Sequence, residues 1–234
     1  MSKSVARPVE FEGISHPLWV RVSLRARRVS LKVNPQGRRI ELVLPRGMSV
    51  DRARAFVSRS RSWIARHSLH LSAPAPALMS GSPISVLGRP LEVVHDPAHR
   101  GQGVLSETCI RVGGDLAFFA RRVRDTLKTL ALREFSARAA QKAELVCKKI
   151  RSVQVRDMRS RWGSCSTSGR LSFCWRLVMA PDHVVDYIVA HEVAHLVEMN
   201  HSRAFWTVVD RLTPHRREAA KWLKAHGLVL HHTI

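Results

Sequence analysis

Apolar and polar side chains alternate along the first part of the chain, in the pattern of β-strands with one buried face. We expect antiparallel strands at residues 19–24, 28–33 and 39–44, with Asn34-Pro35-Gln36-Gly37 as the turn between the last two. The period then lengthens, and residues 50–71 are predicted to form one amphipathic helix. The opening part of the chain is therefore predicted to be a small sheet followed by a helix.

A second strand-rich stretch follows residues 72–77, a segment rich in proline and alanine that is typical of a linker. Alternation resumes at residues 84–87, 91–95 and 104–112, and the proline-free stretch 116–150 is predicted to be a long helix. The pattern predicts an α+β protein. Its parts would be a strand-rich N-terminal subdomain with one amphipathic helix, residues 1–115, and a mainly helical subdomain, residues 116–234.

The helical period is clearest after Pro181, where apolar side chains recur as in a largely buried helix. This helix carries the run His191-Glu192-Val193-Ala194-His195. Histidines four residues apart share one helix face, about 40° apart around the axis, so both imidazoles can bind one metal ion. Glu192 lies between them, where its carboxylate can reach a metal-bound water without binding the metal. The alternative is a pair of core or surface histidines with no ion.

A catalytic zinc usually has three protein ligands, and the chain offers four candidates for the third: Glu198, His201, His215 and Glu218. Three ligands on successive helical turns would span about 10 Å, so Glu198 is expected to support a ligand or face solvent. His201 can join only if the chain turns sharply at Asn200, a residue type that tolerates the left-handed conformation at helix ends. Ser202 would then cap a new helix over residues 203–212. We therefore favour His201.

Two further features are predicted to lie near this site. Residues 170–175 are rich in strand-forming side chains and are expected to form a hairpin with residues 153–156. An edge strand beside the metal helix can pair with an extended substrate, although such a hairpin can equally just cover the core. Tyr187, four residues before His191, is a candidate donor to a developing oxyanion. Alternatively, it packs in the core with its hydroxyl in water.

Basic residues outnumber acidic ones by 39 to 18, which gives a net charge of +21, and 31 of the basic residues are arginine. Such an excess attracts polyanions and predicts salt-sensitive association with nucleic acid or ribosomes. The alternative is a solvated basic surface without a partner. The basic residues cluster at Arg25, Arg27 and Arg28, at Arg52, Arg54, Arg59, Arg61 and Arg66, and at Arg121, Arg122 and Arg124.

The composition also bears on location and on the cysteines. The chain has no apolar run of membrane-spanning length and no apolar signal segment near its start, so we expect a cytoplasmic protein without membrane contact. The four cysteines lack Cys-x-x-Cys spacing, which argues against a zinc ribbon or a disulfide framework. Cys165 is expected to be a reduced, partly buried thiol and not a nucleophile.

Several ordered motifs occur together in the second half of the chain: Arg161-Trp162-Gly163-Ser164-Cys165, the run 175–181, the two-histidine helix and the run 200–206. In this order they resemble the YgjP-like family of predicted zinc metallopeptidases, relatives of the SprT-like proteases. The resemblance extends from about residue 21 to residue 227 and is densest over residues 159–222. It implies a zincin-like domain with His191, His195 and His201 as Zn²⁺ ligands and Glu192 as the catalytic base.

The resemblance implies hydrolysis of peptide bonds by a metal-activated water. The SprT-like relatives act on proteins bound to DNA, which by analogy suggests nucleic-acid-associated protein substrates. A competing hypothesis is a basic nucleic-acid- or ribosome-binding protein with a structural or vestigial metal site. A structural site needs no Glu192 and usually closes its fourth position with a protein ligand, so the intact motif favours the peptidase.

Overall fold

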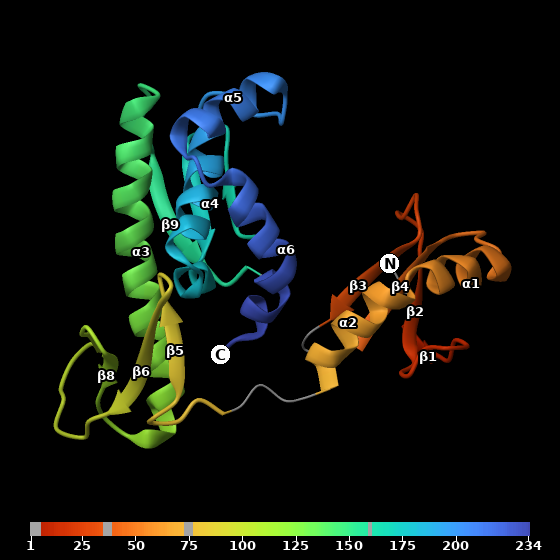
Figure 1. The fold of residues 1–234 in the computed structure, drawn as a ribbon, viewed down its shortest axis with the longest axis horizontal. Coiled ribbons are helices and arrows are strands. Elements are labelled where there is room, and N and C mark those ends of the chain that lie inside the picture. Colours follow the sequence, from red (N-terminus) through yellow and green to blue (C-terminus); the bar gives the residue numbers. More distant parts are fainter. Residues whose placement is uncertain (1–5, 35–38, 73–76, 159–160) are drawn as a thin grey trace. The chain divides into compact units, whose positions relative to one another are not determined.

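The computed structural model describes residues 6–34, 39–72, 77–158 and 161–234 (Figure 1). Most of the predicted turn at 34–37 and of the predicted linker at 72–77 lies outside the described residues. The chain folds into two compact units, Met1–Ala75 and Pro76–Ile234. We refer to them as unit 1 and unit 2. No helix in the described part of the chain is long and apolar enough to cross a membrane.

Unit 1 contains a four-stranded sheet with the order β1-β2-β4-β3. Its strands are β1 (Arg7–Val9), β2 (Leu18–Ser23), β3 (Ser30–Asn34) and β4 (Arg39–Pro45). The antiparallel pairing of β3 with β4 is confirmed, but β2 and β4 run parallel, which the expectation of an all-antiparallel sheet missed. Strand β4 lies between β2 and β3 in the sheet, so β2 and β3 do not pair with each other. Strand β4 is antiparallel to β3 and parallel to β2.

The predicted helix over residues 50–71 is two helices, α1 (Val50–Arg59) and α2 (Arg61–Ser72). The break lies at Ser60, whose hydroxyl donates to the Phe56 carbonyl at 2.8 Å. Serine side chains that bond the preceding turn in this way compete with regular helix geometry. The two helices bury Val57 and Ile64 against Leu18, Ile40 and Leu42 of the sheet, which together form the small core of unit 1.

Unit 2 begins with a second four-stranded sheet, in the order β5-β6-β8-β7. It comprises β5 (Pro83–Val86), β6 (Arg89–His95), β7 (Val104–Leu105) and β8 (Cys109–Val112), so the strand predicted at 104–112 is interrupted. A short 3₁₀ turn, η1 (Leu116–Phe118), leads into the long helix α3 (Phe119–Leu145), which contacts β8 of this sheet. Because the sheet and α3 share one core, the boundary between the units lies at 75/76 and not at the predicted 115/116.

The remainder of unit 2, in the described part of the chain, is a three-stranded sheet and three helices, of which the first packs on α3 and the other two on the first. The sheet has the order β10-β11-β9 and comprises β9 (Ser152–Arg156), β10 (Gly163–Cys165) and β11 (Arg170–Cys174). The 3₁₀ segment η2 (Trp175–Met179) leads into α4 (Asp182–Ala194), and α5 (Arg203–Leu212) and α6 (Arg216–His232) follow. The predicted hairpin of β11 with β9 is wrong, because β11 is parallel to β9 and antiparallel to β10.

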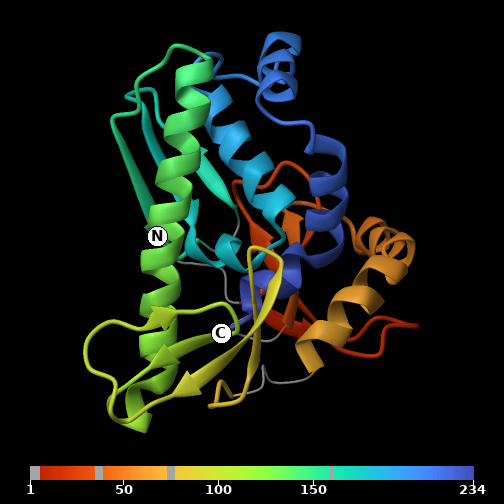
Figure 2. The same ribbon diagram turned by 60° about the vertical axis from the view of Figure 1, so that its left-hand side comes forward.

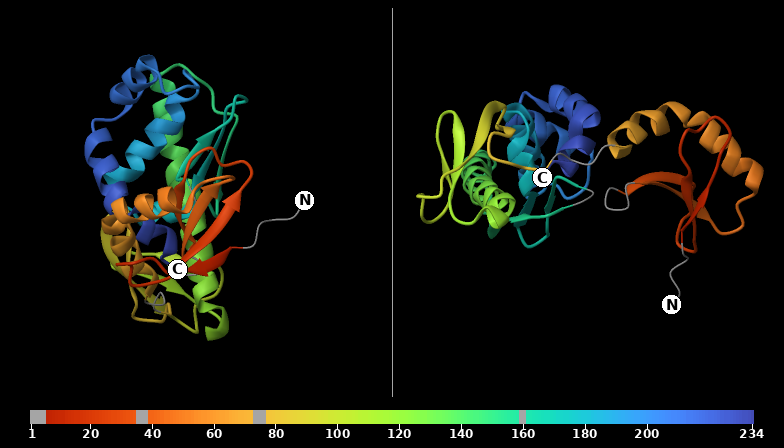
Figure 3. Two further views of the ribbon diagram at one scale, coloured as in Figure 1. Left: turned by 90° about the vertical axis from the view of Figure 1, so that its right-hand side faces the viewer. Right: turned by 90° about the horizontal axis from the view of Figure 1, so that it is seen from below.

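Helices α3 and α4 lie side by side against this sheet, α3 next to β9 and α4 next to β10 (Figures 2 and 3). Helix α4 is covered nearly all round, with Val184, Val185, Val189 and Val193 completely buried. The α+β prediction is confirmed, as are the start of this helix after Pro181 and the helix over residues 203–212. A helix held on several sides is a rigid support for the side chains at its C-terminal end.

Candidate metal centre

Three histidines converge where α4 ends. Among the described residues, one group can hold a metal ion, and it consists of His191, His195 and His201. One nitrogen from each imidazole lies within 4.8 Å of the others. The Nε2 atoms of His191 and His201 are 3.1 Å apart. The two-histidine motif on α4 and the more distant His201 therefore meet at one point.

His201 reaches this point by a different turn from the one predicted. Helix α4 ends at Ala194, and the amides of Val197 and Glu198 donate to the carbonyl of Ala194 in a tight turn. The left-handed turn at Asn200 is wrong, because the described non-glycine residues with positive φ are elsewhere in the chain. Asn200 instead accepts the Ser202 amide on its side chain, at 2.9 Å.

Ser202 caps α5 as predicted, by accepting the Phe205 amide at 3.3 Å. The physical reason for the early end of α4 is a loss of buried surface, since Val197 and Met199 are 44% and 47% exposed. A helix that continued to Asn200 would gain little from packing these side chains.

The other candidate ligands do not join the cluster. Glu198 acts through its backbone, because its carbonyl accepts a hydrogen bond from His195 Nδ1 at 3.1 Å. A carbonyl can only accept, so Nδ1 carries the proton and Nε2 of His195 keeps its lone pair for a cation. His215 precedes α6, and Glu218 lies 3.9 Å from His183, outside the three-histidine group.

The donor set fits a divalent cation. Two imidazole nitrogens 3.1 Å apart need a shared proton or a shared cation between them, and ligands on one tetrahedral zinc are about 3.3 Å apart. Burial, reinforced by the other two histidines, lowers the pKa of His191 to about 4. Burial also lowers the pKa of His195. These two imidazoles are therefore neutral at neutral pH, which is the protonation state that binds metals.

Glu192 is buried beside this cluster, with 5% of its surface exposed. Burial raises the pKa of its carboxyl to about 8, against a smaller lowering effect of Arg161. A cation held by the neighbouring histidines would favour the ionised carboxylate, since opposite charges a few ångströms apart stabilise each other. A cation on the three histidines would therefore keep Glu192 in the ionised form that can accept a proton.

Gly163 on β10 gives the Glu192 side chain its space, a contact that sequence reasoning did not identify. A Cβ atom at position 163 would lie 2.5 Å from Oε1 of Glu192 and 2.6 Å from its Cγ. Glycine in a strand often marks such a close approach, and this was the available signal in the run Arg161-Trp162-Gly163-Ser164-Cys165. The edge strand beside the metal helix is therefore β10, while β11 is the central strand.

Aromatic residues and a thiol complete the surroundings. The Phe205 ring lies 4.9, 4.5 and 4.6 Å from the rings of His191, His195 and His201, respectively. Tyr187 is 8% exposed and its ring meets the His191 ring edge-on at 6.0 Å. Burial, with Glu192 adding to it, raises the pKa of the Cys165 thiol to about 11, so this cysteine is a poor nucleophile.

Comparisons with known proteins identify the family of this chain. The model of the YgjP-like metallopeptidase domain matches residues 27–226. No curated protein matches the sequence. A crystal structure of the metallopeptidase zymogen of Pyrococcus abyssi abylysin aligns with 38% of this chain and 92% of its own, at 18% identity and a TM-score of 0.36.

Proposed function

We propose, because this chain belongs to the YgjP-like metallopeptidase family, that it hydrolyses peptide bonds with a zinc ion held by His191, His195 and His201. Glu192 would be the general base. The observation that carries the proposal is the convergence of three imidazoles beside the buried carboxylate of Glu192, which α4 carries next to His191. Membership of this family makes the protein a hydrolase, and the named ligands, the metal and the base are the finer part that experiments must test.

His191, His195 and His201 would hold the zinc ion, which when bound would supply Lewis-acid polarisation of the scissile carbonyl and lower the pKa of a bound water. Side chains of this protein would orient the ligands and transfer the proton. His195 is oriented by its hydrogen bond to the Glu198 carbonyl, which presents Nε2 to the site. The Glu192 carboxylate, lying against Gly163, accepts the proton of the attacking water and delivers it to the leaving amine nitrogen.

Substrate would bind in an extended form along β10. This strand pairs on one side with β11 and stands at the end of its sheet in the described part of the chain. An edge strand offers free backbone groups to an extended peptide. Tyr187 remains our candidate for stabilising the oxyanion, with packing against His191 as its alternative role.

The test compares the wild type with Glu192→Gln and His201→Ala. Glu192→Gln should keep full zinc occupancy by metal analysis while peptide cleavage falls by about 10²- to 10⁴-fold, the usual contribution of a general base. His201→Ala should lose zinc as well as activity. Glu192→Gln protein with normal zinc and normal cleavage would contradict the assignment of the base.

We further propose that the substrates include proteins associated with nucleic acid. The excess of positive charge supports this, and eight arginines in unit 1 are exposed: Arg25, Arg27, Arg28, Arg52, Arg54, Arg59, Arg61 and Arg66. Charge of this kind strengthens binding to phosphate backbones at low salt. Negligible binding to single- and double-stranded DNA at low ionic strength would contradict this part of the proposal and would also rule out the competing nucleic-acid-binding protein.

A further inference from the structure

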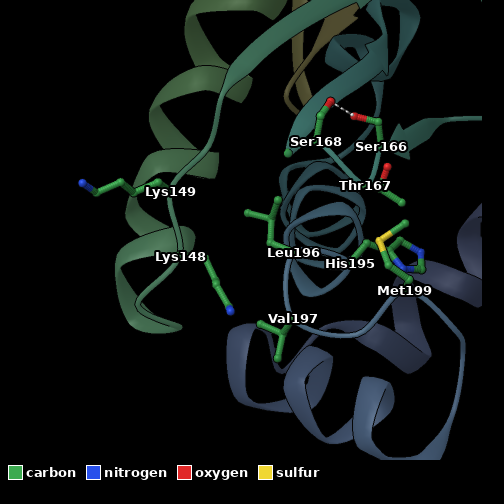
Figure 4. A pocket seen from close by; sticks show the side chains of 10 residues that line it. Lys148, Lys149, Ser166, Thr167, Ser168, His195, Leu196, Val197 and Met199 are labelled. Atoms are coloured by element: carbon green, nitrogen blue, oxygen red, sulfur yellow. Dashed lines mark hydrogen bonds between the residues drawn. The ribbon is translucent and has the colours of Figure 1, made fainter.

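A pocket of about 360 Å³ lies beside His195 in unit 2. One side is formed by His195 and Met199, and the opposite side by Lys148 and Lys149, which follow α3 (Figure 4). The loop between β10 and β11 closes a third side with the hydroxyl groups of residues 166–168. The volume is at the low end for ligand pockets and suits a single side chain or a chain end. The pocket therefore adjoins the proposed metal centre.

The pocket is positively charged. Its lining contains two lysines and no carboxylate side chain. Both lysines are exposed, and neither ammonium group has a hydrogen bond or ion pair within the described part of the chain. In Figure 4, Lys148 extends toward Val197 along the pocket, whereas Lys149 points away from the other labelled side chains. Lys148 is thus the cation best placed to contact a bound group.

Lysines are common after the C-terminus of a helix, where they can bond the last carbonyl groups. Here, the last carbonyl groups of α3 already accept hydrogen bonds from other groups. The carbonyl of Ala143 accepts the amides of Val146 and Lys148, and the carbonyl of Glu144 accepts the amide of Cys147. The carbonyl of Leu145 accepts the guanidinium of Arg211 at 2.8 Å. The lysine ammonium groups are therefore not required to complete α3.

We propose that this lysine pocket receives a carboxylate of the peptide substrate next to the cleaved bond, with Lys148 as its main partner. The inference rests on the proposed peptidase function, since it places the carboxylate beside the metal ligand His195. The methylene groups of an acidic side chain would lie on Val197 and Met199, which are 44% and 47% exposed. The hydroxyls of Ser166 and Ser168, 3.0 Å apart, can rotate to donate to the carboxylate oxygens.

Such a carboxylate has two sources, an aspartate or glutamate side chain and the C-terminus of the peptide. The probe is a set of neutral peptides through which one glutamate is scanned, with a matched glutamine set, each made as the free acid and as the C-terminal amide. Affinity is measured at low salt with zinc-loaded Glu192→Gln protein, in which the peptides stay intact. This protein is compared with three further variants on the same background: Lys148→Gln, Lys148→Glu and Lys224→Gln.

In the parent protein, the best carboxylate peptide should bind about fivefold more tightly than its uncharged match, the upper range for an exposed ion pair. Lys148→Gln should abolish this preference, and Lys148→Glu should reverse it in favour of the uncharged peptides. Lys224→Gln removes the same charge from an exposed position on α6 and should leave it unchanged. A preference confined to the glutamate set identifies a side-chain carboxylate, and one confined to the free acids identifies the chain end.

Equal affinity for the charged and uncharged sets overturns the inference, as does a preference that survives Lys148→Gln or an absence of any peptide binding. Cleavage is measured separately, with the wild type and the same peptides. Zinc-loaded wild type that cleaves none of the bound peptides would contradict the proposed peptidase, while the affinities would still decide the role of the pocket. The two proposals therefore fail on different measurements.

Discussion

The two units of this chain differ in what their side chains can do. Unit 1 has 15 basic and 4 acidic residues, a net charge of +11, whereas unit 2 has 24 basic and 14 acidic residues, or +10. Unit 1 carries about half of the net charge on fewer than half as many residues. All of the proposed metal ligands and Glu192 belong to unit 2. Charge density and the proposed catalytic residues are thus concentrated in different parts of the molecule.

The two units also differ in the extent of their buried cores. Among the described residues, the core cluster of unit 1 has five buried side chains, while that of unit 2 continues through two sheets and several helices around α4. A catalytic site needs side chains held within a fraction of an ångström, whereas phosphate contacts are long-range and tolerate motion. This difference is what we expect if unit 2 carries out the proposed reaction and unit 1 binds a polyanion through its charge.

The largest effect is expected from a single methyl group in unit 2. Gly163→Ala places a Cβ 2.5 Å from Oε1 of Glu192, so the carboxylate must move. A shift of about 1 Å in a catalytic group can cost about 10²-fold in rate. We expect kcat/KM for peptide cleavage to fall by at least about 10²-fold while zinc content stays normal, as measured by kinetics and metal analysis.

A second glycine serves as the matched control. Gly227→Ala meets its nearest neighbour, Trp162, at 3.5 Å, an ordinary van der Waals distance. Activity of this variant should be unchanged. Full activity in Gly163→Ala would show that the Glu192 carboxylate tolerates displacement, which would weaken the view of unit 2 as a precisely built site.

A buried ion pair between Lys142 and Asp186 supports α4. Lys142 is 8% exposed; its ammonium donates to the Leu212 carbonyl at 2.8 Å and pairs with Asp186 at 2.7 Å. It thereby links α3, α4 and α5. Lys142→Met leaves Asp186 without its partner and should lower the free energy of unfolding by about 3 kcal/mol, measured by urea denaturation.

The exposed pair of Lys128 and Asp125 on α3 provides the comparison. Lys128→Met should change the free energy of unfolding by less than about 0.5 kcal/mol. The double variant Lys142→Met, Asp186→Leu should recover much of the lost stability, because no charge is then left buried and unpaired. Equal effects of Lys142→Met and Lys128→Met would mean that the buried link does not support the site.

The local features of this site could be predicted from sequence. The start of α4 after Pro181, the shared face of His191 and His195, and the Ser202 cap all follow from helical period and capping. These depend on neighbours a few residues away. The convergence of His201 was predicted together with a new helix that begins after Ser202. The turn before it was predicted at Asn200, whereas in the structure the chain leaves α4 at His195.

The contacts between distant segments could not be predicted in the same way. The parallel pairing of β11 with β9 and of β2 with β4 depends on which strands meet in the folded chain, and strand periodicity does not specify a partner. The contact between Gly163 and Glu192 likewise joins residues 29 positions apart in the sequence. Neither helical period nor strand alternation contains such information.

A smaller effect, on unit 1, is expected when exposed charge is removed from α1. Replacing Arg52, Arg54 and Arg59 by glutamine should weaken binding to DNA by about tenfold at low salt and flatten its salt dependence, because fewer counterions are released. Cleavage of a short neutral peptide should not change. The measurement is DNA affinity as a function of salt, together with peptide kcat/KM.

The control for this triple variant removes three exposed arginines from unit 2: Arg89, Arg100 and Arg133. It changes the net charge equally but should affect DNA affinity less. If both triple variants weaken DNA binding alike, the positive charge acts as a property of the whole chain, and the functional division between the units fails on this point.

The smallest effect is expected at the N-terminal end of the metal helix. The hydrogen bond from Arg138 holds the pKa of Asp182 below its usual value of 3.8. A carboxyl with a depressed pKa in the folded state stabilises the protein above its unfolded pKa, and this contribution is lost as the pH falls through the folded value. Because the Asp182 side chain is 61% exposed, solvent screens the pair and limits its contribution to about 0.5 kcal/mol.

Asp182→Asn should therefore lower the free energy of unfolding slightly at pH 7, and the difference from wild type should vanish once the pH is well below 3.8. Salt should shrink the difference at pH 7, since the pair is near the surface. Urea denaturation at both pH values and two salt concentrations measures this. A difference above about 2 kcal/mol would mean that the start of α4 depends on this pair and that unit 2 is held less by its apolar core than its burial indicates.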